Sequence, residues 1–276
     1  MRFENSICYV DISNALLFSL PMTPYVFNSL NAYDITNLKM KEESLCSIHF
    51  TEFSVSRFKF IEELIIGDNC CSYVAKFDVS HLMFLTTVKI GANSFTQQKN
   101  GHGDMSSKSF TINSCAKLKY ISIGRYSFSD FGGPFTIKDC PSLTTLIIGD
   151  VSSVSCCFYG CSFILTCKLL FVCCSIVALP ALTEIQIGGQ AFCDCFTVSF
   201  NTLKNLQIIR LGEKAFEGLN KEDSSVAFVS IIFTNSYDSY SIDLPALRSI
   251  SSSGSNFNYC RTIAVKGEQQ GKFLME

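Results

Sequence analysis

A short phrase recurs seven times along this chain of 276 residues. It has apolar residues at positions one, four and six, Gly at seven and Phe at eleven, as in LTEIQIGGQAF from Leu182 to Phe192. The copies begin at Ile61, Leu85, Leu118, Leu143, Leu182, Leu206 and Leu247. Self-similarity at a period of about 20–29 residues indicates a solenoid in which each copy forms one coil.

The spacing between copies is irregular: successive starts lie 24, 33, 25, 39, 24 and 41 residues apart. Most of the excess over the shortest spacing falls after position eleven, so we interpret it as loop insertions on one side of the coils. The fold class that we predict is therefore a repeat solenoid, mainly β, with a curved parallel sheet of about seven to eight coils and irregular loop insertions.

Within a copy, positions four and six alternate with polar residues, as Val88 and Ile90 do, which predicts a strand with one buried face. Gly at position seven suits a positive φ or a close approach of two backbones. The Phe of position eleven predicts a ladder of rings, each burial contributing roughly 1.5–3 kcal/mol. The ladder consists of Phe95, Phe128, Phe192, Phe216 and Phe257.

A second apolar pair precedes the next copy and predicts a strand on the opposite side of each coil. The Pro residues of CPSL and LPAL, at 141, 180 and 245, predict the corner before the first strand, because Pro fixes φ. The pairs are Phe53/Val55, Phe77/Val79, Phe110/Ile112, Phe135/Ile137 and Val198/Phe200.

With these residues the pattern resembles the leucine-rich repeat, L-x-x-L-x-L-x-x-N-x-L, with Phe in its last position. Asn69 and Asn93 occupy the position of the Asn. The phrases IGGQAFCDC and LGEKAFEGL are most similar to the BspA-like (Treponema pallidum-type) subfamily, and the resemblance covers about Phe53 to Phe257. It implies a leucine-rich-repeat solenoid and, through that subfamily, adhesion at a cell surface.

We expect three regions: an N-terminal cap with a degenerate repeat in residues 1–50, the solenoid in 51–257, and a C-terminal tail or cap in 258–276. The ends of a solenoid need such covers. YDITNLKMKEESLCSI (33–48) keeps the phase of the repeat without its Gly and Phe.

Residues 156–179 are almost entirely apolar and long enough to cross a bilayer. In their second half, however, Cys174 and Ile176 match Phe135 and Ile137 of the repeat. We therefore favour an apolar insertion at about 155–170 within the solenoid, with membrane association through 156–179 as the alternative.

Fifteen cysteines are an odd and unusually large set. Cys115 and Cys140 occupy the position that Leu82, Leu179 and Leu203 take in other copies, which predicts buried, reduced thiols. Disulfides are the alternative. We expect no metal site, because paired zinc-ligand spacing is absent from Cys156, Cys157, Cys161, Cys167, Cys193 and Cys195.

No catalytic motif is present: a P-loop, G-x-S-x-G and H-E-x-x-H are all absent, and His102 beside Asp104 suits a solvated loop. We therefore expect no enzyme and no cofactor. The net charge of −2 and pI near 6.0 argue against nucleic acid as a partner. Glu4 and Asp11 interrupt any signal peptide, so we expect a cytoplasmic protein, with the cell surface as the alternative.

Positions three and five of each copy, on its first strand, are expected to point away from the core and to align from coil to coil on the concave face of the sheet. The function that we predict is a non-catalytic module that binds a protein or peptide on this face. A surface, adhesion or membrane-associated structural protein is the alternative, and the oligomeric state stays open. The predicted ligand-binding residues are Glu63, Thr87, Lys89, Tyr120, Ser122, Thr145, Glu184, Gln186, Ile208 and Arg210.

Overall fold

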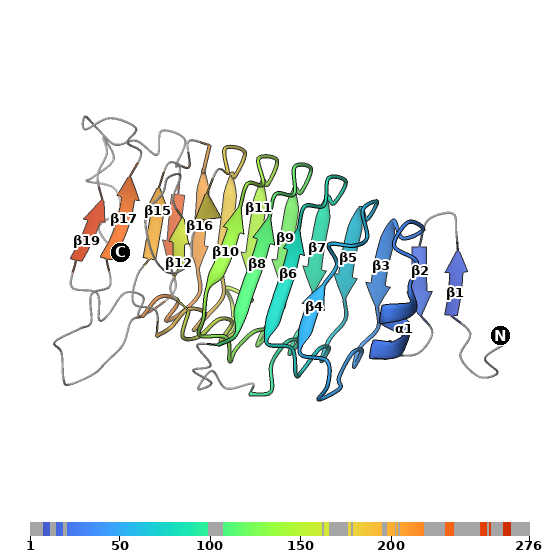
Figure 1. Cartoon of the computed structure of the whole chain (residues 1–276). Coiled ribbons are helices and arrows are strands. Elements are labelled where there is room, and N and C mark those ends of the chain that lie inside the picture. Colours follow the sequence, from blue (N-terminus) through green and yellow to red (C-terminus); the bar gives the residue numbers. More distant parts are fainter. Residues whose placement is uncertain are drawn as a thin grey trace.

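Two sheets of mainly parallel strands form a repeating stack in the computed structural model (Figure 1). The first sheet has ten strands, and only its edge pair β1–β2 is antiparallel. The described residues are 8–11, 15–18, 21–98, 107–161, 163–165, 176–177, 179–194, 198–201, 203, 205–217, 230–234, 249–252, 254 and 262–265.

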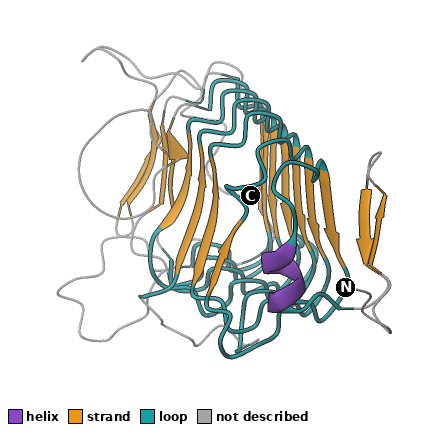
Figure 2. Ribbon diagram, turned by 45° about the vertical axis from the view of Figure 1, so that its right-hand side comes forward, coloured by secondary structure: helices purple, strands orange, loops and turns teal. Residues whose placement is uncertain are grey.

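The strands of the first sheet are, in spatial order, β1 (Cys8–Asp11), β2 (Ala15–Phe18), β3 (Asn37–Met40), β5 (Glu63–Ile66), β7 (Thr87–Ile90), β9 (Tyr120–Ile123), β11 (Thr145–Ile148), β14 (Glu184–Ile187), β16 (Ile208–Leu211) and β18 (Ser249–Ser252). Those of the nine-stranded second sheet are β4 (Glu52–Ser54), β6 (Lys76–Ser80), β8 (Ser109–Asn113), β10 (Phe135–Lys138), β13 (Ile176–Val177), β12 (Phe163–Leu165), β15 (Val198–Asn201), β17 (Ser230–Thr234) and β19 (Thr262–Val265). Loops join the two stacks of strands at both edges (Figure 2).

Each copy of the repeat supplies a strand to the first sheet and then one to the second, so the predicted mainly β, repeating architecture is confirmed at this level. The register follows the repeat, since Thr87, Tyr120 and Thr145, all at position three, are direct partners in β7, β9 and β11. Strand β3 extends the same sheet, so the degenerate copy between residues 33 and 48 also contributes a strand.

The described residues of the long apolar stretch at 156–179 are arranged differently from the single insertion at about 155–170 that the sequence favours. Extra residues already enter at 150–154, and the ring of Phe158 then stacks on Phe128, which makes 155–161 part of the coil. Ile176 pairs with Ile137, as their match in the repeat predicts. Strand β12 adds a further strand between β13 and β15.

The two chain ends contribute to the stack as well. Helix α1 (Pro24–Ser29) lies beside β3 and β4, where Phe27 stacks on Phe53 with 5.5 Å between ring centroids (Figure 2). Arg57 donates hydrogen bonds to the carbonyls of Phe27 and Asn28, which hold the helix in place. At the other end, residues 262–265 of the expected tail form β19, which pairs with β17.

Phenylalanine rings fill the space between the sheets in two parallel stacks. In the stack of position eleven, successive centroids lie 4.6 Å apart for Phe95 and Phe128 and 4.9 Å for Phe128 and Phe158. The second stack consists of Phe residues from strands of the second sheet. It packs edge to face against the first stack, with 5.1 Å between the ring centroids of Phe110 and Phe128. The first stack continues through Phe192 and Phe216, whereas the predicted Phe257 lies outside the described residues.

The Gly of position seven is required mainly by close approach between coils. A Cβ on Gly124 would lie 2.5 Å from the carbonyl carbon of Gly91, although the φ of Gly124 is ordinary. Gly149, also at position seven, has a positive φ of 74°, and positive φ falls as well at positions nine and eleven, as in Tyr126 (60°) and Phe128 (58°). The packing of neighbouring coils therefore holds the bulky residue Phe128 in the left-handed region, which L-residues seldom adopt.

We expect Phe128→Ala to lower the free energy of unfolding by about 3–5 kcal/mol, because the ring packs fully buried between its neighbours of the ladder. Tyr120→Ala, on the outside of the sheet, should change it by no more than about 0.5 kcal/mol. Urea denaturation of both variants measures the difference. Equal destabilisation would contradict the assignment of faces.

Candidate functional site

The ten residues predicted to bind a ligand lie, together with Ile65 and Ile147, in two rows of six on one side of the first sheet. Strands β5, β7, β9, β11, β14 and β16 bury their second and fourth residues and turn their first and third outward. We call these outward first and third residues the outer face. Its first row is Glu63, Thr87, Tyr120, Thr145, Glu184 and Ile208, and its second row is Ile65, Lys89, Ser122, Ile147, Gln186 and Arg210.

Toward the C-terminal end of the outer face, the charged side chains pair with one another. Arg210 Nη1 forms an ion pair and a hydrogen bond with Glu184 Oε1. The same carboxylate oxygen accepts a hydrogen bond of 2.8 Å from Gln186 Nε2. A ligand that engages Glu184 or Arg210 must therefore compete with contacts that already exist.

The middle of the outer face is mixed in chemistry. Lys89 Nζ lies 5.7 Å from the ring centroid of Tyr120, and Tyr120 is flanked in register by Thr87 and Thr145. Half-buried Ile65 and Ile147 lie in the second row. This combination offers hydrogen bonds and apolar contact along the same strands.

The corner that leads into the first sheet carries two exposed aromatic side chains that the sequence analysis missed. Phe60 and Phe84 directly precede position one of their copies, and their ring centroids lie 6.0 Å apart. Lys117 Nζ, from the next coil, lies 4.7 Å from the centroid of Phe84. The signal was an apolar residue before position one in two consecutive copies, FI and FL.

A column of small side chains at position ten was also missed. Ser94 Oγ accepts a hydrogen bond of 3.0 Å from Cys70 N and donates one of 2.8 Å to Gly67 O, in the preceding coil. Ser127 Oγ repeats this arrangement with Ser94 N and Gly91 O. The column is a buried support between the coils, because its hydroxyl groups satisfy backbone groups there.

Cysteine shares this column with serine. Cys70 Sγ donates to Lys41 O and Cys157 Sγ to Gly124 O, equivalent carbonyls of position seven. Burial raises the pKa of both thiols to about 12. Cys115 and Cys140 are fully buried like Leu82, as predicted. Nine cysteines with described side chains are free thiols, and of these only Cys46 is exposed; the nine are Cys46, Cys70, Cys71, Cys115, Cys140, Cys156, Cys157, Cys161 and Cys193.

The described cysteines that were considered for a metal donate hydrogen bonds to oxygen atoms: Cys157 and Cys161 to backbone carbonyls, Cys156 to Gln190 Oε1 and Cys193 to Glu217 Oε2. Cys161 Sγ donates to Phe131 O at 2.9 Å, away from the carbonyl that Cys157 contacts. Within the described residues, no three or more His, Cys, Asp and Glu side chains gather as a metal site would require. Cys167, Cys195, His102 and Asp104 lie outside the described residues.

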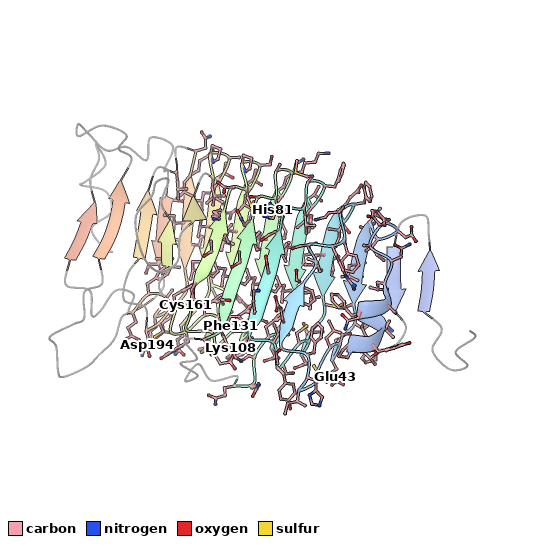
Figure 3. The ribbon with its side chains drawn as sticks, viewed as in Figure 1. Glu43, His81, Lys108, Phe131, Cys161 and Asp194 are labelled. Carbon is pink, nitrogen blue, oxygen red and sulfur yellow. The ribbon has the colours of Figure 1, made fainter. Side chains whose placement is uncertain are left out.

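One ion pair is buried at the edge of the coils. Lys108 Nζ lies 2.7 Å from Asp130 Oδ2, and the two side chains are 4% and 1% exposed. The same oxygen accepts a hydrogen bond from Gln97 N. Figure 3 shows Lys108 beside Phe131, whose ring centroid lies 5.4 Å from Nζ. Asp130 thus contacts both Gln97 and Lys108.

Comparison with protein-family models, with curated proteins and with solved structures gave no match. Among the helices in the described part of the chain, none has the length and apolar character needed to cross a membrane.

We expect Lys108→Met to lower the free energy of unfolding by about 3–5 kcal/mol, because it leaves the Asp130 carboxylate buried without its cation. Lys76→Met is the matched control, since it breaks an exposed pair with Glu52 and should change stability little. Urea denaturation compares the two variants. A loss as small for Lys108→Met as for the control would contradict the buried pair.

We also expect the free energy of unfolding to fall as the pH rises above about 8.5, where unfolded thiols ionise. Folded Cys157 keeps its proton up to about pH 12 because its pKa is raised, so only the unfolded state gains from the higher pH. Denaturation with reductant at about pH 7.5 and about pH 9.5 measures the loss, which is at most about 1.4 kcal/mol per thiol and pH unit. In Cys157→Ala the fall in the free energy of unfolding between the two pH values should be smaller. An unchanged fall would contradict the raised pKa of Cys157.

Proposed function

We propose that this chain is a non-catalytic, leucine-rich-repeat-like module that binds a protein or peptide along its outer face. The observation that carries the proposal is the alignment of the two rows, in which six coils present side chains in direct register. Solenoids use such extended surfaces to bind partners. An extended ligand could lie across several coils and meet a different side chain at each.

The chemistry of the rows supports a polypeptide ligand. Tyr120 provides an aromatic surface at little entropic cost, and its register partner Thr145 adds a hydroxyl group. Half-buried Ile147 is accessible beside them. Apolar contact combined with nearby hydrogen-bonding groups is the usual composition of a protein interface.

Selection from a random peptide library displayed on phage, with the full chain as bait, tests this function. We expect selected peptides to bind at least about tenfold more weakly to Thr145→Arg, because the long cation occupies the centre of the outer face. The matched control is Thr136→Arg, which changes a half-buried Thr of β10 in the second sheet.

Peptides that lose binding to Thr136→Arg and retain it with Thr145→Arg would place the binding surface on the second sheet. A library that yields no peptide dependent on Thr145 would contradict the proposal as well. Unchanged thermal unfolding of both variants shows that the loss concerns the surface and not the fold.

A further inference from the structure

Three adjacent coils carry a patch of aromatic rings and lysines where the corner meets the outer face. The register of Thr87 with Tyr120 places Phe84 beside Lys117 and Thr86 beside Lys119. Phe60 belongs to the preceding coil and contacts Phe84. The basic–aromatic patch consists of Phe60, Phe84, Lys89, Lys117, Lys119 and Tyr120.

The aromatic half of the patch is unusually open. Phe60 is 44% exposed and Phe84 39%, while the ten largest fully buried side chains of the described chain are all Phe. The two rings lie side by side with 6.0 Å between centroids, and Lys117 Nζ lies over Phe84, so the pair forms one apolar surface bordered by a cation. Exposed apolar surface of this kind marks a site of interaction when polar groups surround it.

The lysines of the patch are not neutralised. Elsewhere in the described chain, Lys39, Lys76, Lys108, Arg210 and Lys214 each lie within ion-pair distance of a carboxylate. Lys89, Lys117 and Lys119 have no such partner among the described residues. Glu62 occupies position two of its copy, as Thr86 and Lys119 do in the next two coils, and Glu63 already pairs with Lys39. One exposed carboxylate against three lysines leaves the patch with a positive charge.

We propose that the partner of this module is an acidic polypeptide segment with at least one large apolar side chain. Its carboxylates would face Lys89, Lys117 and Lys119, and its apolar side chain would cover Phe60 and Phe84. This inference rests on the proposed function and names the chemistry of its ligand. Charge complementarity decides it, since the available cations lie beside uncovered rings and not in the continuous basic stripe that a phosphate backbone requires.

Fluorescence anisotropy with the full chain tests the inference on a labelled peptide that alternates Asp and Glu with Phe. We expect binding that weakens as salt rises, because the lysines lie at the surface. The same peptide with Asn and Gln in place of Asp and Glu should bind at least about tenfold more weakly.

Lys117→Glu combined with Lys119→Glu should reduce the affinity for the acidic peptide at least about tenfold, and Phe84→Ala should reduce it too. Lys138→Glu is the matched control, because it reverses a charge on β10 of the second sheet and should leave affinity unchanged. Lys117→Arg with Lys119→Arg should retain binding, which separates loss of charge from loss of folding.

Equal binding of the acidic and amide peptides would overturn the inference, because charge would then play no part. Tighter binding of an oligothymidylate through the same two lysines would overturn it in favour of a polyanion. Phage-selected peptides that depend on Thr145, lack acidic residues and ignore Lys117→Glu/Lys119→Glu would leave the proposed function standing while this inference fails.

Discussion

Neighbouring coils are held at the spacing of hydrogen-bonded parallel strands, about 4.8 Å, and the interior of the stack follows from that distance. Phe rings at position eleven match it, with 4.6 Å between Phe95 and Phe128. The same distance leaves no room for a Cβ where Gly124 meets Gly91. It also brings Ser94 Oγ within reach of Cys70 N in the coil before. The spacing set by backbone pairing thus favours a flat ring at position eleven, no side chain at position seven and a small side chain at position ten.

The strands could be predicted from the sequence because their pattern is local and has a period of two. The pairing of Ile176 with Ile137 could be predicted in spite of a long insertion, because the apolar pattern of the second strand is still recognisable in the sequence. Phe158 was missed because residues 150–154 displace it from position eleven, and a fixed spacing cannot follow that shift. Gly at position seven was expected to serve a positive φ or a close approach of two backbones, and the close approach is found at Gly124 and the positive φ at Gly149. The positive φ of Phe128 was not expected, because the local preference of Phe gives no sign of it.

The outer face was predicted residue by residue, since alternation alone determines which side chains leave the core. The contacts made on that face were not predictable in the same way. The pairing of Arg210 with Glu184 and the position of Lys117 over Phe84 join residues of different coils. They depend on register and side-chain direction, which local alternation leaves undetermined. The position of this surface could therefore be predicted from the sequence, whereas its charge pattern became visible only in the structure.

That charge pattern divides the outer face and the corner that precedes it into two parts. Toward the C-terminal end, Glu184 already binds both Arg210 and Gln186, so a ligand there gains only the difference between old and new contacts. In the corner before β7 and β9, Lys117 lies over the exposed ring of Phe84, and neither Lys117 nor Lys119 has a carboxylate partner among the described residues. A ligand there gains new ionic and apolar contacts together. Binding free energy should therefore concentrate near β7 and β9, although the backbone repeats almost unchanged along the stack.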